Sequence, residues 1–308
     1  MEEELIEIEK KRLHVWHIVF CVMILFVIIG IFIIIYSNKK SKVDVLKNIE
    51  EENLSVTESQ NEEQISGQEE LLTEEKNEEE IANNVKLPNL TQNGINNIND
   101  IYKPKENKIV YLTFDDGPST TVTPLILDYL KEVNIKATFF VLGSRVDLNP
   151  ELTKRAYEEG HYIANHGYTH IYNQIYSNTQ NVLDEYNQTE QSIRNAIGVP
   201  EYSSHLFRFP GGLAGGRYAA IKQEAKQLLN ENNIVNLEWN ALTGDAEGKK
   251  TKEEMFEYLK YTMEEKTSVV ILMHDAAGKI LTYELLPEIV NYLKEQGYIF
   301  GNMYDVIN

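Results

Sequence analysis

The feature that most constrains the fold is an alternation of two kinds of segment from about residue 108 to the end of the chain. Short runs rich in β-branched and aromatic residues alternate with longer amphipathic stretches of helical period. Seven expected strands and six expected helices succeed one another in this region. Such alternation predicts parallel strands joined by helices. An open doubly wound sheet and a closed (β/α) barrel both fit it.

The expected elements have clear local signals. Several of the helical stretches begin near Ser, Thr or Asn and end near Gly or Asn, as helix caps require. The expected strands span residues 109–114, 137–143, 161–165, 205–209, 234–240, 268–274 and 298–303. The expected helices span residues 124–133, 149–160, 179–197, 217–232, 251–266 and 284–297.

Most of the expected strands end at or near polar residues able to do chemistry. These residues are Asp115 with Asp116, His166, Arg208, Asp245 and His274. In a (β/α) barrel, the C-terminal ends of many strands converge on one site. An open sheet instead concentrates its ligands at one crevice. The spread of polar strand ends therefore favours a barrel.

The first expected strand runs directly into Asp115-Asp116-Gly117-Pro118. Two close carboxylates repel, and the pKa of one rises unless a cation lies nearby. A divalent metal and an arginine would remove that repulsion. On its own, however, Asp-Asp-Gly-Pro is more typical of an ordinary turn with solvated carboxylates than of a metal site.

A second cluster, His166-x3-His170, places two imidazoles four residues apart. On one helical turn, such residues face the same way. With a carboxylate from another strand end they would supply three protein ligands and leave open positions, as in catalytic zinc sites. Taken alone, two packed or exposed histidines explain the pattern equally well.

Two further segments carry candidate partners for these groups. Arg208 precedes Phe-Pro-Gly-Gly, and an arginine there could pair with a carboxylate. Asp245 follows an aromatic strand candidate, and His274 closes a fully apolar one. A histidine oriented by an aspartate is a competent general acid. Each of these could also be an unremarkable strand end.

Together, the ordered segments Thr-Phe-Asp-Asp-Gly-Pro, His-x3-His, Arg-Phe-Pro-Gly-Gly, Trp…Asp and Leu-Met-His resemble the polysaccharide deacetylase family, of the NodB-homology, carbohydrate esterase type. The resemblance runs from about residue 108 to 303. It implies a distorted (β/α) barrel of about seven β units. It also implies metal-dependent removal of acetyl groups from N-acetylated or O-acetylated sugars.

The resemblance assigns the metal ligands and the base. Asp116, His166 and His170 match the metal ligands, with zinc expected and cobalt or nickel as alternatives. Asp115 matches the catalytic base. Arg208 matches the arginine that pairs with that base.

The resemblance also assigns the acid and the substrate contacts. His274 matches the general acid, and Asp245 matches the aspartate that orients it. Gly211 matches the residue whose backbone N–H helps to hold the oxyanion. Leu272 matches the leucine that lines the pocket for the acetyl methyl group.

The chain departs from the family pattern at three positions. Gly167 stands where Ser or Thr is usual, which could loosen the loop or be offset by Thr169. Gly211 stands where Tyr is frequent and removes a ring from the sugar site. Ala246 follows Asp245 where Trp is usual, and Trp239 is a candidate for the missing aromatic wall. These changes touch the shape of the substrate site more than its metal or proton carriers.

The N-terminal third of the chain differs from the rest in composition. After a short N-terminal segment (1–14), residues 18–36 carry no charge and suit a membrane-spanning helix. No small-x-small cleavage site follows, so we expect an uncleaved anchor over 15–36 rather than a signal peptide or a buried core helix. Residues 37–107 are rich in acidic and polar residues and predict a flexible stalk. Lysines lie on both sides of the expected span, so charge does not orient it.

The whole chain has a formal net charge of −19, which argues against nucleic-acid binding. Its one cysteine excludes a disulfide framework. We therefore expect a single-pass membrane protein with an extracellular catalytic domain (108–308), acting on the N-acetylglucosamine of peptidoglycan and contributing to lysozyme resistance, with no obligate protein partner. N-acetylmuramic acid, chitin-type oligomers, an exopolysaccharide and O-acetylated xylan are alternative substrates. A non-catalytic wall-binding protein is the alternative from another class.

Overall fold

The computed structural model describes residues 87–308. The expected N-terminal segment, the expected membrane anchor (15–36) and most of the expected stalk lie outside the described residues. Within residues 87–308, no helix is both long and apolar enough to cross a membrane.

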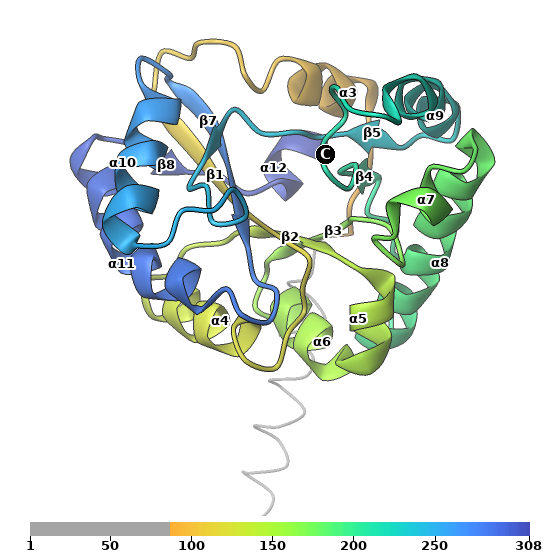
Figure 1. Ribbon diagram of the computed structural model, residues 1–308, viewed down its shortest axis with the longest axis horizontal. Helices are drawn as coiled ribbons and strands as arrows, with labels where there is room; N and C mark the ends of the chain where they lie inside the picture. Colours follow the sequence, from red (N-terminus) through yellow and green to blue (C-terminus); the bar gives the residue numbers. More distant parts are fainter. Residues whose placement is uncertain (1–86) are drawn as a thin grey trace, which may run out of the picture. The chain divides into compact units, whose positions relative to one another are not determined.

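The described domain is built on one sheet in which every strand pair is parallel (Figure 1). The strands are β1 (Ile109–Asp115), β2 (Thr138–Val141), β3 (Tyr162–Asn165), β4 (Leu206–Phe207), β5 (Val235–Asn236), β6 (Ala241–Leu242), β7 (Ser268–His274) and β8 (Ile299–Phe300). Their order is β5-β4-β3-β2-β1-β7-β6, and β8 pairs with the start of β1.

The expected α/β fold of parallel strands joined by helices is confirmed, and the expected distorted barrel is a half-barrel. Strands β5 and β6 lie at the two ends of the strand order, and no ladder joins them within residues 87–308. Both are only two residues long. Between them, the carbonyls of Leu237 and Glu238 accept hydrogen bonds from the Arg208 side chain. Because a buried side chain takes these acceptors, they do not pair with a neighbouring strand.

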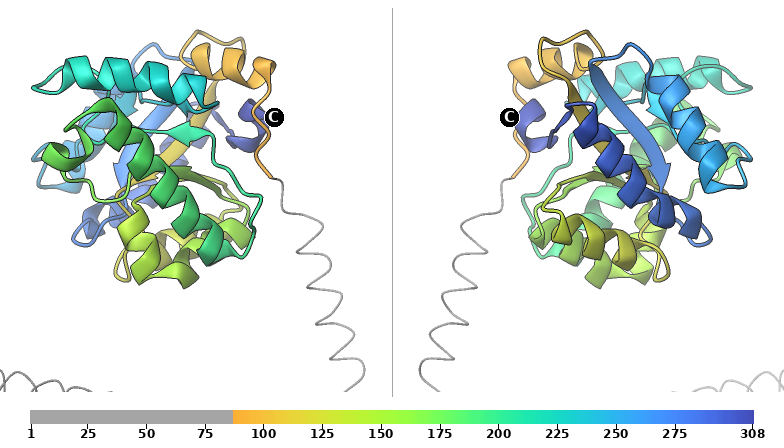
Figure 2. Two further views of the ribbon diagram at one scale, coloured as in Figure 1. Left: turned by 90° about the vertical axis from the view of Figure 1, so that its right-hand side faces the viewer. Right: turned by 90° about the vertical axis from the view of Figure 1, so that its left-hand side faces the viewer.

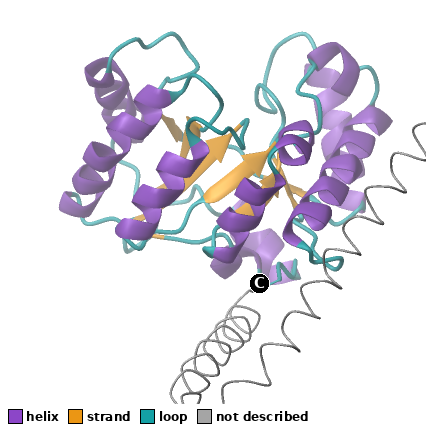
Figure 3. Ribbon diagram, turned by 90° about the horizontal axis from the view of Figure 1, so that it is seen from below, coloured by secondary structure: helices purple, strands orange, loops and turns teal. Residues whose placement is uncertain are grey.

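Helices flank the strands (Figure 3). They are α3 (Gln92–Asn99), α4 (Thr123–Glu132), α5 (Gly143–Leu148), α6 (Pro150–Glu158), α7 (Tyr172–Ile175), α8 (Thr179–Ile197), α9 (Ala219–Glu231), α10 (Lys252–Met263), α11 (Ile280–Glu295) and α12 (Tyr304–Ile307). The six expected helices correspond to α4, α6, α8, α9, α10 and α11. The expected range of α8 matches because both ends carry strong signals. The Asn178 side chain caps its start, and Gly198, with φ of 72°, ends it.

The alternation of side chains along β1 and β7 separates the core from the site. Val110, Leu112 and Phe114 point outward into the main hydrophobic core, which the surrounding helices share. Tyr111 belongs to a second core on the opposite face of the sheet. Because side chains alternate along a strand, Thr113 and Asp115 lie on that same inner face. The same rule places Leu272 and His274 on the inner face of β7.

The folded domain begins earlier than the expected boundary at residue 108. Helix α3 packs against α12 near the C-terminus (Figure 2). Ile98 and Ile101 are each only 2% exposed. The Asn-rich composition of this stretch gives little sign of a helix, but the Thr91 side chain caps its start, and Gly94 and Ile98 are buried on the side that faces the domain. Residues from about 90 onward therefore belong to the folded domain and not to a stalk.

Candidate active site

Asp115 and His274 lie side by side at the ends of the two central strands. The pairing of β1 with β7 places them in register, one strand apart. Both are largely buried, with 2% and 9% exposure. Since in-register residues of neighbouring strands point to the same face, both side chains reach the same inner site.

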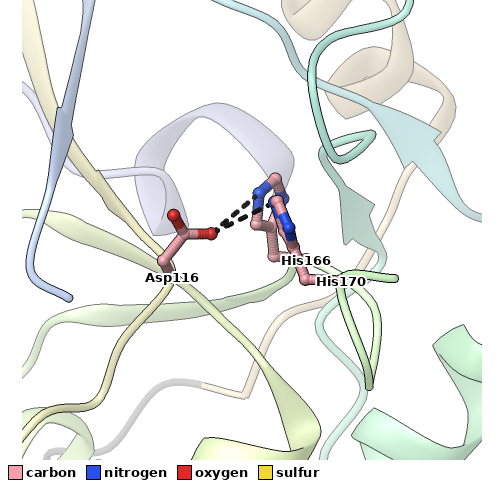
Figure 4. A group of neighbouring side chains, drawn as sticks. All are labelled: Asp116, His166 and His170. Carbon is pink, nitrogen blue, oxygen red and sulfur yellow. Dashed lines mark ion pairs between the residues drawn. The ribbon is translucent and has the colours of Figure 1, made fainter. Parts of the chain in front are cut away.

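Asp116, His166 and His170 also come together at this site. The Oδ1 atom of Asp116 lies 3.5 Å from His166 Nε2 and 3.4 Å from His170 Nε2. Figure 4 shows the carboxylate facing the two imidazole rings. Strict alternation would send Asp116 to the opposite face, but its φ of 75° ends the strand. This left-handed turn allows adjacent aspartates to serve one site.

The donor atoms of these three residues fit a divalent cation. One ligand atom from each lies within 4.8 Å of the others. The Nδ1–H of His166 donates to the Arg208 carbonyl over 2.8 Å, so Nε2 keeps its lone pair. Burial lowers the pKa of His166 to about 3, which keeps the ring neutral. Asp116 Oδ1 is buried and accepts no hydrogen bond. A buried acceptor without a donor beside the neutral His166 ring suits a metal ion.

The two histidines do not share a helical turn, as their spacing had suggested. Residues 166–170 form a loop in which Gly167 and His170 both have positive φ, of 82° and 59°. Glu185 on α8 holds this loop. Its Oε2 accepts from the backbone N–H groups of Tyr168 and Thr169, over 2.8 and 2.9 Å. Its Oε1 accepts from the Thr169 hydroxyl.

Gly167 is required by this loop conformation. A Cβ added there would lie 3.0 Å from Ile175 Cδ1 and 3.2 Å from Glu185 Oε2, at a φ that side chains rarely adopt. The hydroxyl that Gly167 lacks is present instead at Thr169, which bonds Glu185. Sequence reasoning missed Glu185, because nothing near residue 185 marks it as a partner of residues 168 and 169.

Arg208 is fully buried and binds the expected base. Its Nη1 donates to Asp115 Oδ1 and to the Thr113 hydroxyl, each over 2.8 Å. Its guanidinium also lies 3.9 Å above the centre of the Phe140 ring. Burial raises the pKa of Asp115, and the Arg208 charge opposes that rise. The ion pair with Arg208 thus offsets part of the cost of ionising a buried carboxylate.

His274 and Asp245 form a hydrogen-bonded pair. His274 Nδ1 lies 2.8 Å from Asp245 Oδ1, and the His274 backbone N–H donates to Oδ2. The Thr282 hydroxyl donates to the same Oδ2. Burial opposes protonation of His274, but its hydrogen bond to Asp245 and the nearby carboxylates raise its pKa to about 9. The ring is therefore protonated near neutral pH, as a general acid must be.

The remaining expected substrate residues surround these groups. The backbone N–H of Gly211 makes no hydrogen bond within residues 87–308. A Cβ at Gly211 would lie 2.4 Å from the Tyr172 hydroxyl, so Tyr172 occupies the space that a larger residue would take. The Trp239 ring centre lies 5.7 Å from Arg208 Cζ. Leu272 is 7% exposed on the same face of β7 as His274.

Asp275 is a second buried acid that sequence reasoning missed. Its Oδ2 accepts from the Thr123 hydroxyl, and its backbone N–H donates to the Asp115 carbonyl. A Cβ at Gly117 would lie 2.1 Å from Oδ2, so only glycine fits there. Burial raises the pKa of Asp275 to about 7. Asp275 thus fixes the turn that carries Asp116.

Comparisons with known proteins agree with this geometry. The family model described as polysaccharide deacetylase matches residues 102–230. A peptidoglycan-N-acetylglucosamine deacetylase of Bacillus cereus is 34% identical over 204 residues, which cover 65% of this chain and 70% of that protein. Peptidoglycan-N-acetylglucosamine deacetylase PgdA of Listeria monocytogenes is 35% identical over 201 residues. The match covers 65% of this chain but only 39% of the Listeria protein.

A solved structure shares the fold. The structure of a Streptococcus mutans CE4 esterase has a TM-score of 0.61 and 30% sequence identity, covering 68% of this chain and 90% of that one. The family model lies within the described domain, and the Bacillus relative is matched over 70% of its own length at 34% identity. The chain therefore belongs to the polysaccharide deacetylase family.

Proposed function

We propose that this chain removes N-acetyl groups from the N-acetylglucosamine of peptidoglycan and releases acetate and a free amino sugar. The observation that carries the proposal is the placement of Asp115 and His274 in register on neighbouring strands, with Asp116, His166 and His170 beside them. Amide hydrolysis needs a base for the attacking water and an acid for the poor amine leaving group. The names of the Listeria and Bacillus relatives support peptidoglycan as the substrate.

Asp116, His166 and His170 would hold the metal, with zinc proposed and cobalt or nickel as alternatives. A divalent cation at this position would polarise the acetyl carbonyl and acidify a water molecule. Two imidazoles and one carboxylate suit zinc and leave coordination positions open.

The protein groups would then handle the protons. Asp115 takes a proton from the attacking water, and Arg208 keeps Asp115 ionised before that step. The Gly211 N–H donates to the developing oxyanion, an interaction of a kind worth about 3–4 kcal/mol. His274, held by Asp245, gives its proton to the departing amine.

The proposed location is the outer face of the cell membrane, with residues 15–36 as the anchor and the wall as the partner. The uncharged run from 18 to 36 supports this part of the proposal. Protease added to protoplasts should then remove the catalytic domain, and full protection would argue against it. A deletion strain should gain lysozyme sensitivity and wall acetylation.

The direct test uses the fragment 87–308, stripped of metal with a chelator and reloaded with zinc. We expect the reloaded protein to release acetate from muropeptides, read by mass spectrometry, and the stripped protein to release none. Asp115→Asn and His274→Ala should retain bound metal but lose roughly a thousandfold or more in turnover. Near-normal turnover by either variant would show that its role is assigned wrongly. Wall binding without acetate release would favour a non-catalytic protein.

A further inference from the structure

An open pocket of about 660 Å³ adjoins the metal ligands. Asp116 and His170 line it, so it is continuous with the candidate active site. Arg145 and Leu148 of α5, with Asn149 just after that helix, also line it. A polymer with one sugar at the metal site would therefore place a neighbouring group beside α5.

Arg145 stands out among the arginines of residues 87–308. Its side chain is exposed and makes no ion pair or hydrogen bond within the described residues. Each other arginine in this part of the chain has a partner: Arg155 binds Asp128 and Glu159, Arg194 binds the Tyr202 carbonyl, Arg208 binds Asp115, and Arg217 lies over the Tyr218 ring. Arg145 is thus an uncompensated positive charge at the edge of the site.

The surroundings of Arg145 suit an anionic ligand with a small apolar part. Asp116 is the sole acid that lines this pocket within the described residues, and it belongs to the metal ligands. The nearby Asp147 already accepts from the Tyr168 hydroxyl over 2.9 Å. Leu148 is 68% exposed and lines the same pocket. A carboxylate carried on a short aliphatic group would meet both the guanidinium and the Leu148 side chain.

We propose that Arg145 forms a subsite for a carboxylate on the sugar next to the one that is deacetylated. This inference rests on the proposed function and narrows its substrate. In peptidoglycan, that neighbour carries a lactyl group with a methyl and a carboxyl, either free or extended by a peptide that has carboxylates of its own. Chitin and the xylan backbone offer no such charge. Arg145 would thus favour an anionic glycan over these neutral polymers.

The test compares two ligands that differ only in charge. One is a tetrasaccharide of alternating N-acetylglucosamine and N-acetylmuramic acid with free lactyl carboxylates, and the other has those groups as primary amides. We expect the zinc-loaded fragment 87–308 to have a kcat/KM about fivefold higher on the acid, the scale of one exposed ion pair. Arg145→Gln should abolish this preference, Arg145→Lys should keep part of it, and added salt should weaken it.

Lys154→Gln is the matched control, because it removes one positive charge from the neighbouring α6 helix without touching the pocket. It should keep the wild-type preference. An unchanged preference in Arg145→Gln, or an equal loss on both ligands, would overturn the subsite. Calorimetric measurement of the binding of the acid and amide tetrasaccharides distinguishes failure of the Arg145 subsite from failure of the proposed deacetylase function. An acid preference in binding that depends on Arg145, without acetate release, would overturn the enzymatic function alone.

Discussion

Arg208 shows how a single buried side chain organises this site. Its guanidinium donates to Asp115, to Thr113 and to two backbone carbonyls after β5. Its own carbonyl accepts from His166 Nδ1 and so sets the tautomer of a metal-ligand candidate. A buried charge is tolerated when it is paired and fully hydrogen-bonded. One residue therefore links the candidate base, the candidate metal ligands and the open edge of the sheet.

The raised pKa of His274 leads to a prediction about pH. Its pKa rises from 6.5 to about 9, so the folded protein binds this proton more tightly than the unfolded chain does. The stabilisation from the pair with Asp245 is present in full below pH 6.5 and disappears as the pH rises through 9. Activity that needs protonated His274 should likewise persist past neutral pH and fall on the alkaline side.

Asp245→Asn should move that alkaline limb of kcat/KM to lower pH, because the amide no longer stabilises the imidazolium. The profile of kcat/KM against pH measures the shift. Thr282→Val, which removes a neighbouring bond to Asp245 without changing its charge, is the control and should shift the limb less. An alkaline limb that stays in place in Asp245→Asn would exclude His274 as the group that titrates.

Among the secondary-structure elements, α8 has a role beyond packing. Through Glu185 it holds the loop that carries His170, although none of the three candidate metal ligands lies on α8 itself. Partners that orient metal ligands commonly contribute ten- to a hundredfold in metal affinity.

Glu185→Gln should therefore weaken zinc binding about tenfold. The amide has no negative charge, so its oxygen accepts more weakly from the loop N–H groups, and its NH2 group can only donate to the Thr169 hydroxyl. Competition with a chromophoric chelator measures the affinity. Asp184→Asn changes an exposed carboxylate on the same helix that does not touch the loop, and it should bind zinc like the wild type. Equal affinities in all three proteins would reduce Glu185 to a packing residue.

For the described domain as a whole, the position of α3 determines what must be retained for folding. Ile98 and Ile101 are buried against residues from the C-terminal end, in the inner core. Burying one isoleucine contributes about 1.5–3 kcal/mol. The free energy of unfolding of such domains is only about 5–15 kcal/mol, so losing the burial of both isoleucines would remove a large part of it.

A fragment of residues 108–308 should accordingly unfold at a clearly lower temperature than residues 87–308, or fail to stay soluble. Thermal unfolding followed by circular dichroism compares the two. Ile98→Ala in the longer fragment should cost about 2–5 kcal/mol, which separates burial from mere chain length. Identical melting of the two fragments would mean that α3 contributes nothing to stability.

Much of this architecture follows from local sequence signals. The boundaries of β7 and α8 match their expected ranges, because an apolar run ending at His274 and the caps Asn178 and Gly198 act within a few residues. The sequence motifs predicted the family that the comparisons confirm, and the motif residues lie together at the ends of β1, β3, β4 and β7. Short elements such as α5, α7 and β6 were not predicted from the sequence, because two to six residues show too little hydrophobic periodicity.

The tertiary structure decided what depends on residues far apart in the chain. Three features require distant segments to meet. The barrel is open between β5 and β6, Glu185 holds the loop of residues 166–170 by hydrogen bonds, and Asp275 packs against Gly117. Arg145 is conspicuous only once the partners of the other arginines are known. Local sequence sets helices, strands and turns through short-range sterics and hydrogen bonds. Which side chains face each other, and which charge lacks a partner, is determined only when the chain packs.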